Sequence, residues 1–460
     1  MQKKLLTLAV AGALAGPGMA LAQSSVEVYG FISLSPVWLK YTEGNAAINN
    51  SGAAVGSVSK ADVSSHGSNV GVRGREALGG GLNAWFQIEE NTPMERSNNI
   101  STTPASRNSA VGFQGGFGNV YWGQWTTPWA DLDGLWAVGH VGGYSPILAV
   151  IDRRETTGSA PHIACANTTL SGGSGVFAIP SCDPVKASGG VGHPFWKRTS
   201  QSIRYDSPNM GGAVFSLLWQ TPEGKTPSVA GNLVPQENAQ MWSGSLTWSG
   251  MGGRARAGAA LDRHKDFTTI GDTDTGWKLA GGWNFGVVDI GLDFDHMTYK
   301  CSGAVANVLG GGSAPTATSG GTAPNVVSGN QQGGAWNGQS GSCNSVGATG
   351  DVVSKAWGIA ASVPVGIGAV KASYAKLKSL EGVAISDTGA KYYTVGYVHR
   401  FSKRTELGLA YAKIKNETNA TMTWTGTGPD TNGLTGANGI TNPVFGASPS
   451  VIQLSMVHRF

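Results

Sequence analysis

Apolar and polar side chains alternate in short stretches along almost the whole chain. Within residues 254–262, one parity carries Arg254, Arg256 and Asp262, and the other carries only alanines and Leu261. Residues 288–295 repeat the pattern, with Val, Ile, Leu and Phe at the even positions and Asp or Gly at the odd ones. A period of two indicates β-strands with one apolar and one polar face. Repeated in segments of about ten residues, it is typical of strands that face lipid on one side and a lumen on the other.

The connections between these segments also alternate, in length. Glycine-rich turns at 78–81, 115–118 and 251–253 are tight, whereas polar segments elsewhere are long, as a barrel with a short-turn rim and a long-loop rim requires. A barrel of about 16 strands is too wide for side chains to fill and leaves an aqueous channel. We predict an all-β fold, a transmembrane antiparallel β-barrel of 16 strands, with Tyr393, Tyr397 and Tyr411 in interfacial girdles. The predicted strands are 26–36, 66–75, 82–90, 106–114, 118–125, 199–207, 211–220, 237–248, 254–264, 274–285, 287–299, 354–364, 368–378, 390–401, 404–415 and 450–460.

The N-terminus predicts an exported protein. Two lysines at 3 and 4 precede an apolar run over 5–16, and small residues at 20–22 precede Gln23, which is the order of a secretory signal peptide. We therefore expect a signal peptide at 1–22 and a barrel over 23–460, located in the cell outer membrane. No segment approaches the roughly 20 apolar residues of a membrane-spanning helix. The mature charge, 30 − 28 = +2, is too weak to favour nucleic acid.

Four cysteines lie as two local pairs, Cys165 with Cys182 and Cys301 with Cys343, in Gly/Ser/Ala-rich segments. An exported chain enters an oxidising compartment, so pairing within each loop is the simplest of the three possible connectivities. Free thiols and a metal site are the alternatives, and no metal-ligand spacing supports the second. We expect no metal and no cofactor.

Several segments resemble the Gram-negative general porin family, in particular its beta-proteobacterial and neisserial branch. The resemblance implies a 16-stranded barrel, a homotrimer, and a third extracellular loop, here about 126–198, that folds inward and narrows the pore. A second long surface loop is expected at about 300–353. The terminal Phe460 is similar to the family's signal for the outer-membrane assembly machinery. The segments that carry the resemblance are 25–30, 70–82, 117–124, 202–208, 402–405 and 457–460.

In that family, basic groups on the barrel wall face acidic groups on the inward loop. By motif, Arg73 and Arg204 correspond to wall cations, and alternation places Arg75 on the side of Arg73. Paired lumenal arginines, bound to Glu89 or Asp206, are the alternative interpretation. Gln124 stands where enteric-type relatives carry a wall arginine, and Phe31 stands at a lumen-facing position that is basic in some of them. Ion selectivity is therefore left open, with a slight lean to anions. The loop contributes Asp131, Asp133, Arg153, Arg154 and Glu155.

The resulting hypothesis is an outer-membrane porin, a channel for passive diffusion of ions and small hydrophilic solutes, surrounded by outer-membrane lipid and lipopolysaccharide. A substrate-selective porin for carbohydrates or anionic solutes is the runner-up, because Trp122, Trp125, Trp129 and Trp136 could stack on sugar rings. Packing of the loop is the favoured role for these rings. A surface adhesin, a secreted soluble β protein and an enzyme are weaker alternatives, and no G-x-S-x-G, H-E-x-x-H or complete Walker motif supports catalysis.

Overall fold

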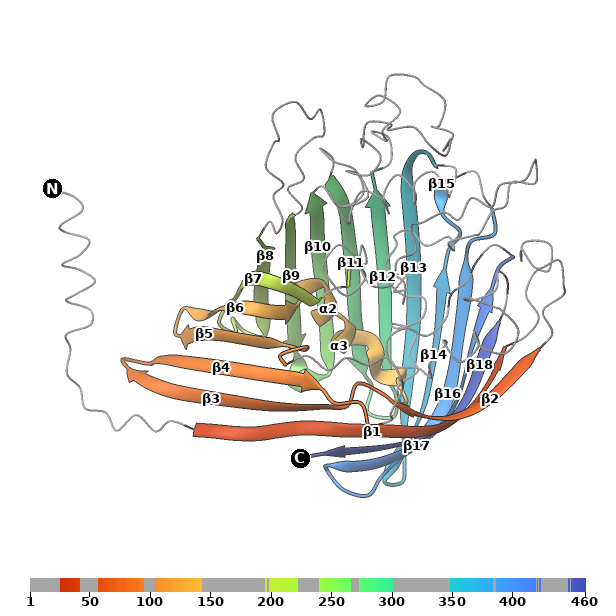
Figure 1. The fold of residues 1–460 in the computed structure, drawn as a ribbon, viewed down its shortest axis with the longest axis horizontal. Coiled ribbons are helices and arrows are strands. Elements are labelled where there is room, and N and C mark those ends of the chain that lie inside the picture. Colours follow the sequence, from red (N-terminus) through yellow and green to blue (C-terminus); the bar gives the residue numbers. More distant parts are fainter. Residues whose placement is uncertain are drawn as a thin grey trace, which may run out of the picture.

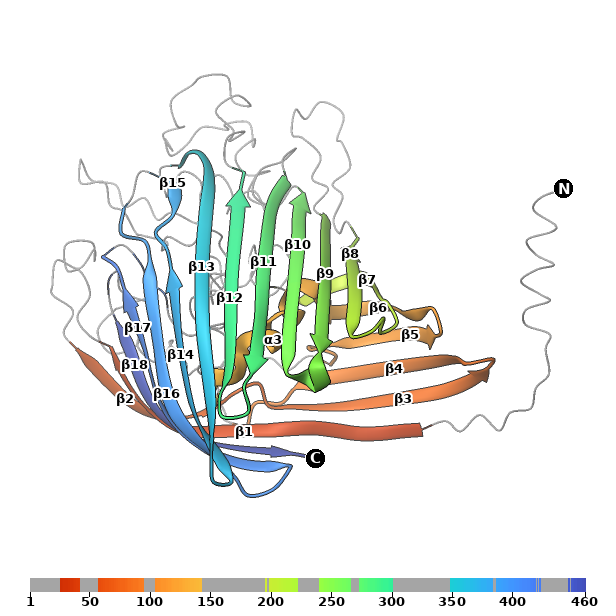
Figure 2. The same cartoon turned by 180° about the vertical axis from the view of Figure 1, so that it is seen from behind.

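The computed structural model describes residues 25–41, 57–94, 104–142, 195–196, 198–221, 240–265, 273–300, 348–383, 386–418, 420, 422, 446 and 448–460. These residues form one antiparallel sheet of 18 strands (Figures 1 and 2). The strands are β1 (Ser25–Tyr41), β2 (Val58–Ser65), β3 (Asn69–Gly79), β4 (Leu82–Asn91), β5 (Ser109–Gly115), β6 (Gly118–Thr126), β7 (Arg198–Asp206), β8 (Ala213–Gln220), β9 (Gln240–Gly250), β10 (Ala255–Lys265), β11 (Thr273–Asn284), β12 (Asp289–Tyr299), β13 (Ala348–Val365), β14 (Gly368–Leu377), β15 (Glu381–Val383), β16 (Ala390–Arg400), β17 (Thr405–Asn416) and β18 (Pro449–Arg459).

The sheet closes into a barrel with 16 strand positions. Both β2 and β3 pair with β1, along its second and first halves, and both β14 and β15 pair with β13, so the count is 18 − 2 = 16. The first strand pairs with the last, β18, and the backbones of Gly30 and Phe460 exchange hydrogen bonds of 3.2 and 3.1 Å. The prediction of a 16-stranded antiparallel barrel is confirmed.

The first strand, the beginning of β13 and two short strands differ from the sequence-based expectation. Strand β13 begins at Ala348 where Ser354 was expected, and β15 was not predicted. The first strand was expected to end at Pro36 but continues to Tyr41. Proline has no N–H to donate, and the pairing with β18 passes over Ser35 and Pro36 and resumes at Val37 in the same register. The strand β2, which pairs with this extension, was not predicted, because Val58–Ser65 carries few apolar residues.

Large apolar side chains on the strands point outward. Exposed residues alternate with buried ones, as in β10, where Leu261 is 67% exposed and Asp262 is 1% exposed. Two of the tyrosines predicted for the girdles, Tyr393 and Tyr411, lie on this outward face among other aromatic rings. This is the polarity of a barrel that presents apolar side chains to lipid.

A short helical segment lies inside the barrel (Figure 1). It consists of α2 (Pro128–Asp131), α3 (Asp133–Trp136) and the 3-10 turn η1 (Ala137–Gly139), which together run along the inner faces of β9 to β14. Trp129, Leu132 and Trp136 have no exposed surface and form a core with small inward residues of the wall. Among the described residues, no helix is long and apolar enough to cross a bilayer. We call residues 127–142 the inward segment.

Candidate functional site

Arg204 on β7 attaches the N-terminal end of the inward segment to the barrel wall. Its guanidinium forms ion pairs with Asp131 and Asp206, the latter at 2.9 Å, and Nη1 donates to the carbonyl oxygen of Thr126 at 2.9 Å. Burial raises the pKa of Asp131, and the charge of Arg204 opposes that shift. Arg204, which was predicted to be a wall cation, is buried and paired with both carboxylates. It therefore holds the start of the segment in place.

A second attachment lies at Lys278 on β11, which has no exposed surface. Its ammonium lies 2.8 Å from a carboxylate oxygen of Asp133, 3.6 Å from one of Asp293, and 5.7 Å from the ring centre of Trp129. The indole N–H of Trp196 also donates to Asp133. The predicted loop residue Asp133 thus faces a wall cation, as the family resemblance implied, although in a buried contact.

Further wall side chains bind the backbone of the inward segment. Arg256 donates to the carbonyl oxygen of Leu135 at 3.1 Å while also binding Asp289. Lys371 donates to that of His140 at 3.1 Å, and Gln453 to that of Val141 at 2.6 Å. Motif matching missed Lys278, Arg256, Lys371 and Gln453 as attachment points. The sequence could have indicated these residues only in one way: each is a polar side chain at a position of its strand that alternation assigns to the lumen.

The two tryptophans of the segment have packing roles. Trp129 and Trp136 are buried between the segment and the wall. Trp122 is 44% exposed on the outward face and tilts against Phe113, and Trp125 packs edge-on against Trp85 and Tyr121. These positions agree with the packing interpretation and leave no continuous row of free aromatic faces among the four predicted rings.

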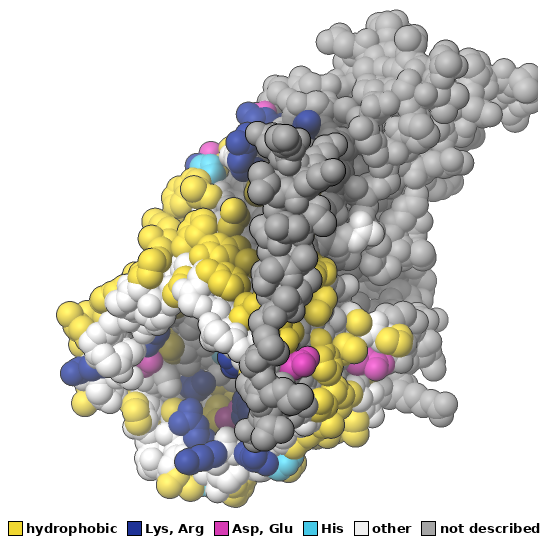
Figure 3. All heavy atoms as spheres, turned by 90° about the vertical axis from the view of Figure 1, so that its left-hand side faces the viewer, with side chains coloured by type: hydrophobic (Ala, Val, Ile, Leu, Met, Phe, Trp, Pro, Cys, Tyr) yellow, Lys and Arg dark blue, Asp and Glu magenta, His cyan; other side chains and the backbone are white. Residues whose placement is uncertain are grey.

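The wall on the other side of the lumen carries arginines with larger exposed areas. Arg73 on β3 is paired with Glu27 and lies 4.8 Å from the ring centre of Tyr29. Arg75 is exposed on the same strand and forms no ion pair with any described residue. Figure 3 shows basic side chains gathered around a hollow of the surface, with few acidic ones beside them. The two β3 residues that alternation grouped together are indeed on one face.

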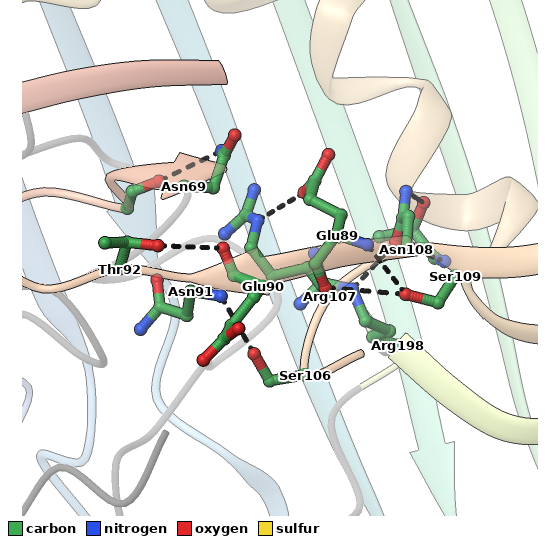
Figure 4. Close-up of polar contacts among 12 residues, drawn as sticks. Asn69, Glu89, Glu90, Asn91, Thr92, Ser106, Arg107, Asn108, Ser109 and Arg198 are labelled. Atoms are coloured by element: carbon green, nitrogen blue, oxygen red, sulfur yellow. Dashed lines mark hydrogen bonds and ion pairs between the residues drawn. The ribbon is translucent and has the colours of Figure 1, made fainter. Parts of the chain in front are cut away.

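Near the long-loop ends of β4 and β5, a polar network adds two arginines that motif matching missed (Figure 4). Arg107 is paired with Glu89, and Arg198 donates to the side-chain oxygen of Asn108 at 2.7 Å. Gln124 donates to the carbonyl oxygens of residues 105 and 107, each at 3.3 Å. The position that is basic in relatives is therefore occupied by a side chain that holds the β4–β5 connection, and Arg107 supplies a charge close by.

A third basic group lies at the short-turn rim. Arg459 binds Glu406 at 3.3 Å, and Arg400 is the register partner of that glutamate. Phe31, the second departure from the family pattern, is the register partner of Arg459 on the neighbouring strand. The basic charge absent at position 31 is thus present one strand away.

The acidic residues of the inner wall are distributed differently. On β10, β11 and β12, Asp262, Asp274, Asp293 and Asp295 are at most 4% exposed. They lie on the part of the wall that the inward segment covers. The lumen therefore has one side whose carboxylates are covered and another whose arginines reach solvent.

Other predicted residues lie outside the described part of the chain. This holds for the predicted signal peptide and for the following residues: Arg153, Arg154, Glu155, Cys165, Cys182, Cys301 and Cys343.

Comparison with known proteins decides the family. The model of the Gram-negative porin family matches residues 7–420. The chain belongs to this family. It is 25% identical to outer membrane porin protein 32 of Delftia acidovorans over 433 residues, 92% of each protein. Its fold is similar to that of an anion-selective porin from Comamonas acidovorans, with a TM-score of 0.61 and 20% identity over 95% of this chain and 100% of the other. A structure of OmpF from Salmonella typhi gives a TM-score of 0.51 at 10% identity, covering 95% and 97%.

This porin is thus an outer-membrane β-barrel that forms a channel for general diffusion, and it is not an enzyme. The predicted fold, function and location are confirmed. The water-filled lumen of such a barrel sets ion preference through the charges that line it.

Proposed function

We propose that this porin conducts small hydrophilic anions in preference to cations. The observation that carries the proposal is the separation of charges inside the barrel. Asp293 and Asp295 are buried on the wall covered by the inward segment, whereas Arg73 and Arg75 on β3 are exposed. An ion in the lumen experiences the exposed charges most strongly, because solvent and distance screen the others.

Among the charged residues that face the open part of the lumen, ion pairs neutralise only some of the arginines. Glu27 binds Arg73, Glu89 binds Arg107, and Glu406 binds Arg459. Arg75 and Arg400 form no ion pair with any described carboxylate, although Arg400 lies opposite Glu406 across the strands. A lumen with unbalanced guanidinium groups lowers the energy of an entering anion and raises that of a cation.

A protein of similar fold also supports anion preference. An anion-selective porin from Comamonas acidovorans has a similar fold. A carbohydrate-selective channel has no comparable support, because Trp129 and Trp136 are buried and Trp122 faces outward. The slight lean to anions drawn from the sequence therefore becomes the preferred hypothesis.

The test is the reversal potential of the refolded porin in a planar bilayer under a salt gradient. We expect the sign that indicates anion preference. The double variant Arg75→Gln/Arg400→Gln removes two exposed cations that do not attach the inward segment, and it should reduce the anion-to-cation permeability ratio severalfold at low salt. The outward-facing pair Arg263→Gln/Lys265→Gln is the matched control and should keep the ratio of the wild type. A cation-selective wild type, or equal effects of both variants, would refute the proposal.

We also propose that the barrel assembles as a homotrimer inserted by the outer-membrane assembly machinery and surrounded by lipopolysaccharide. The family resemblance supports the trimer, and the terminal Phe460 ends β18 where that strand meets β1. Chemical cross-linking of the porin in isolated outer membranes should yield a trimer band. Exclusively monomeric protein would contradict the assembly proposal without affecting the channel proposal.

A further inference from the structure

Three lysines form a row across three neighbouring strands. Lys376 on β14 is the register partner of Lys391 on β16, and Lys391 is the register partner of Lys415 on β17. Adjacent strands are about 4.8 Å apart, so the row spans about 10 Å across the sheet. Figure 2 shows these strands side by side.

The row lies on the outward face of the barrel. Val370 on β14, Val395 on β16 and Leu409 on β17 share the parity of the lysines and are 40%, 53% and 55% exposed. The opposite parity faces the lumen, where Lys371 binds the inward segment. The three ammonium groups therefore face the surroundings of the barrel and not the pore.

Along the barrel axis, the row lies at the extracellular membrane–water interface. All three lysines are at the long-loop ends of their strands, since the short turns of β14, β16 and β17 are at the other ends. Two residues closer to the centre, on the same face, lie Tyr374 and Tyr393, whose ring centres are 5.2 Å apart. Because aromatic girdles mark the headgroup depth, the lysines lie just beyond the apolar zone on the extracellular side.

No carboxylate compensates this row among the described residues. Like charges directly opposite each other across strands are destabilising, yet none of the three ammonium groups has an ion pair there. The nearby acidic groups are bound elsewhere: Glu381 accepts hydrogen bonds from Lys355 at 2.7 Å, and Glu417 accepts them from Ser379 at 2.6 Å and from Gly389 at 2.7 Å. An anion bound from outside the protein would relieve this repulsion.

We propose that the lysine row, Lys376, Lys391 and Lys415, is a binding site for the phosphate groups of the phosphorylated glycolipid of the outer leaflet, lipid A. The proposal deepens the lipopolysaccharide contact of the proposed function by assigning it a site. Ammonium groups are point charges suited to phosphate, and a row about 10 Å long can engage both phosphates of one bisphosphorylated headgroup while its acyl chains lie against the apolar face below. Basic residues at an anionic membrane surface add to one another's attraction, so three of them should give an affinity effect well above measurement error.

The experiment titrates a fluorescent, bisphosphorylated lipid A into the full-length porin in detergent and measures binding by anisotropy. The triple variant Lys376→Gln/Lys391→Gln/Lys415→Gln should bind at least on the order of tenfold more weakly than the wild type. The control Lys40→Gln/Arg263→Gln/Lys265→Gln removes three outward charges that do not form a row, and it should lose clearly less affinity. Dephosphorylated lipid A should bind weakly to all three proteins.

Three outcomes would overturn the assignment. These are equal binding by the wild type and the row variant, equal losses in the row variant and the control, or effective competition by phosphatidylglycerol at the concentration at which lipid A competes. Single-channel conductance of the same samples is the separate readout for the channel. We expect it to be unchanged in the row variant, because the lysines face away from the lumen, so failure of the lipid site and failure of the channel are distinguishable.

Discussion

Fully buried lysines are rare in folded proteins unless they are paired, and Lys278 is buried with carboxylates on two sides. It joins β11 to Asp133 of the inward segment. Removal of one partner of a buried ion pair typically costs about 3–5 kcal/mol, because the remaining charge stays buried. At the scale of single residues, this contact is where we expect the channel to be most sensitive.

Lys278→Met should therefore loosen the inward segment and lower the temperature at which the barrel unfolds. We expect noisier single-channel currents and a lower transition temperature in heat-modifiability gels. Lys265→Met, which removes an outward-facing lysine that is not part of the lysine row, is the matched control and should behave as the wild type. Steady currents and an unchanged transition temperature in Lys278→Met would show that the ion pair does not hold the segment.

The sequence predicted which parity of each strand faces the lumen, but not which lumenal residues would be covered. Arg204 and Asp206 lie on one face by alternation, and one interpretation paired them, as the structure does. What the pattern cannot reveal is the path of the inward segment, which depends on close fits such as that of Gly291 with the carbonyl of Trp136. A Cβ at Gly291 would lie 2.0 Å from that oxygen.

At the scale of elements, the inward segment ends in a group that can sense pH. Burial, and then the positive charge of Lys371 and the nearby His66, lower the pKa of His140 to about 4, while the backbone of Gly142 opposes the shift. The ring Nε2 of His140 is buried and has no hydrogen-bond partner among the described residues. At neutral pH the docked imidazole is therefore uncharged.

A released His140 would have an ordinary pKa near 6.5. Between about pH 6.5 and pH 4, the released form binds a proton that the docked form does not. Docking of residues 137–142 should hence weaken as the pH falls through this window and change no further below it. We expect current fluctuations that increase between pH 7 and pH 4.5, and a His140→Gln variant that lacks this increase. The control His399→Gln, on the outward face, should retain it. Fluctuations independent of pH in the wild type would exclude the switch.

The long strands were predictable, whereas the two short strands β2 and β15 were missed. Predicted and observed boundaries for β10 and β18 differ by one residue at each end, because alternation is strong where one face contacts lipid. The strand β2 was missed since Val58–Ser65 combines lysine, aspartate and serines and follows a polar connection. Its place in the sheet is specified by pairing with the second half of β1, a contact that no local pattern encodes.

At the scale of the whole molecule, the closed sheet and the inward segment together define the function. Sixteen strand positions enclose a lumen too wide for side chains to fill. The segment then covers one wall and leaves the arginines of the other facing the solvent. A barrel built in this way conducts without a conformational cycle, so its current should be proportional to voltage and should not saturate with small salts.

Single-channel recording of the refolded porin in a planar bilayer tests this account most directly. The account predicts stepwise, ohmic openings that appear in groups of three when one trimer inserts. A correctly folded barrel, shown by heat modifiability and by a β-sheet circular dichroism spectrum, that inserts into the bilayer and passes no current would contradict it.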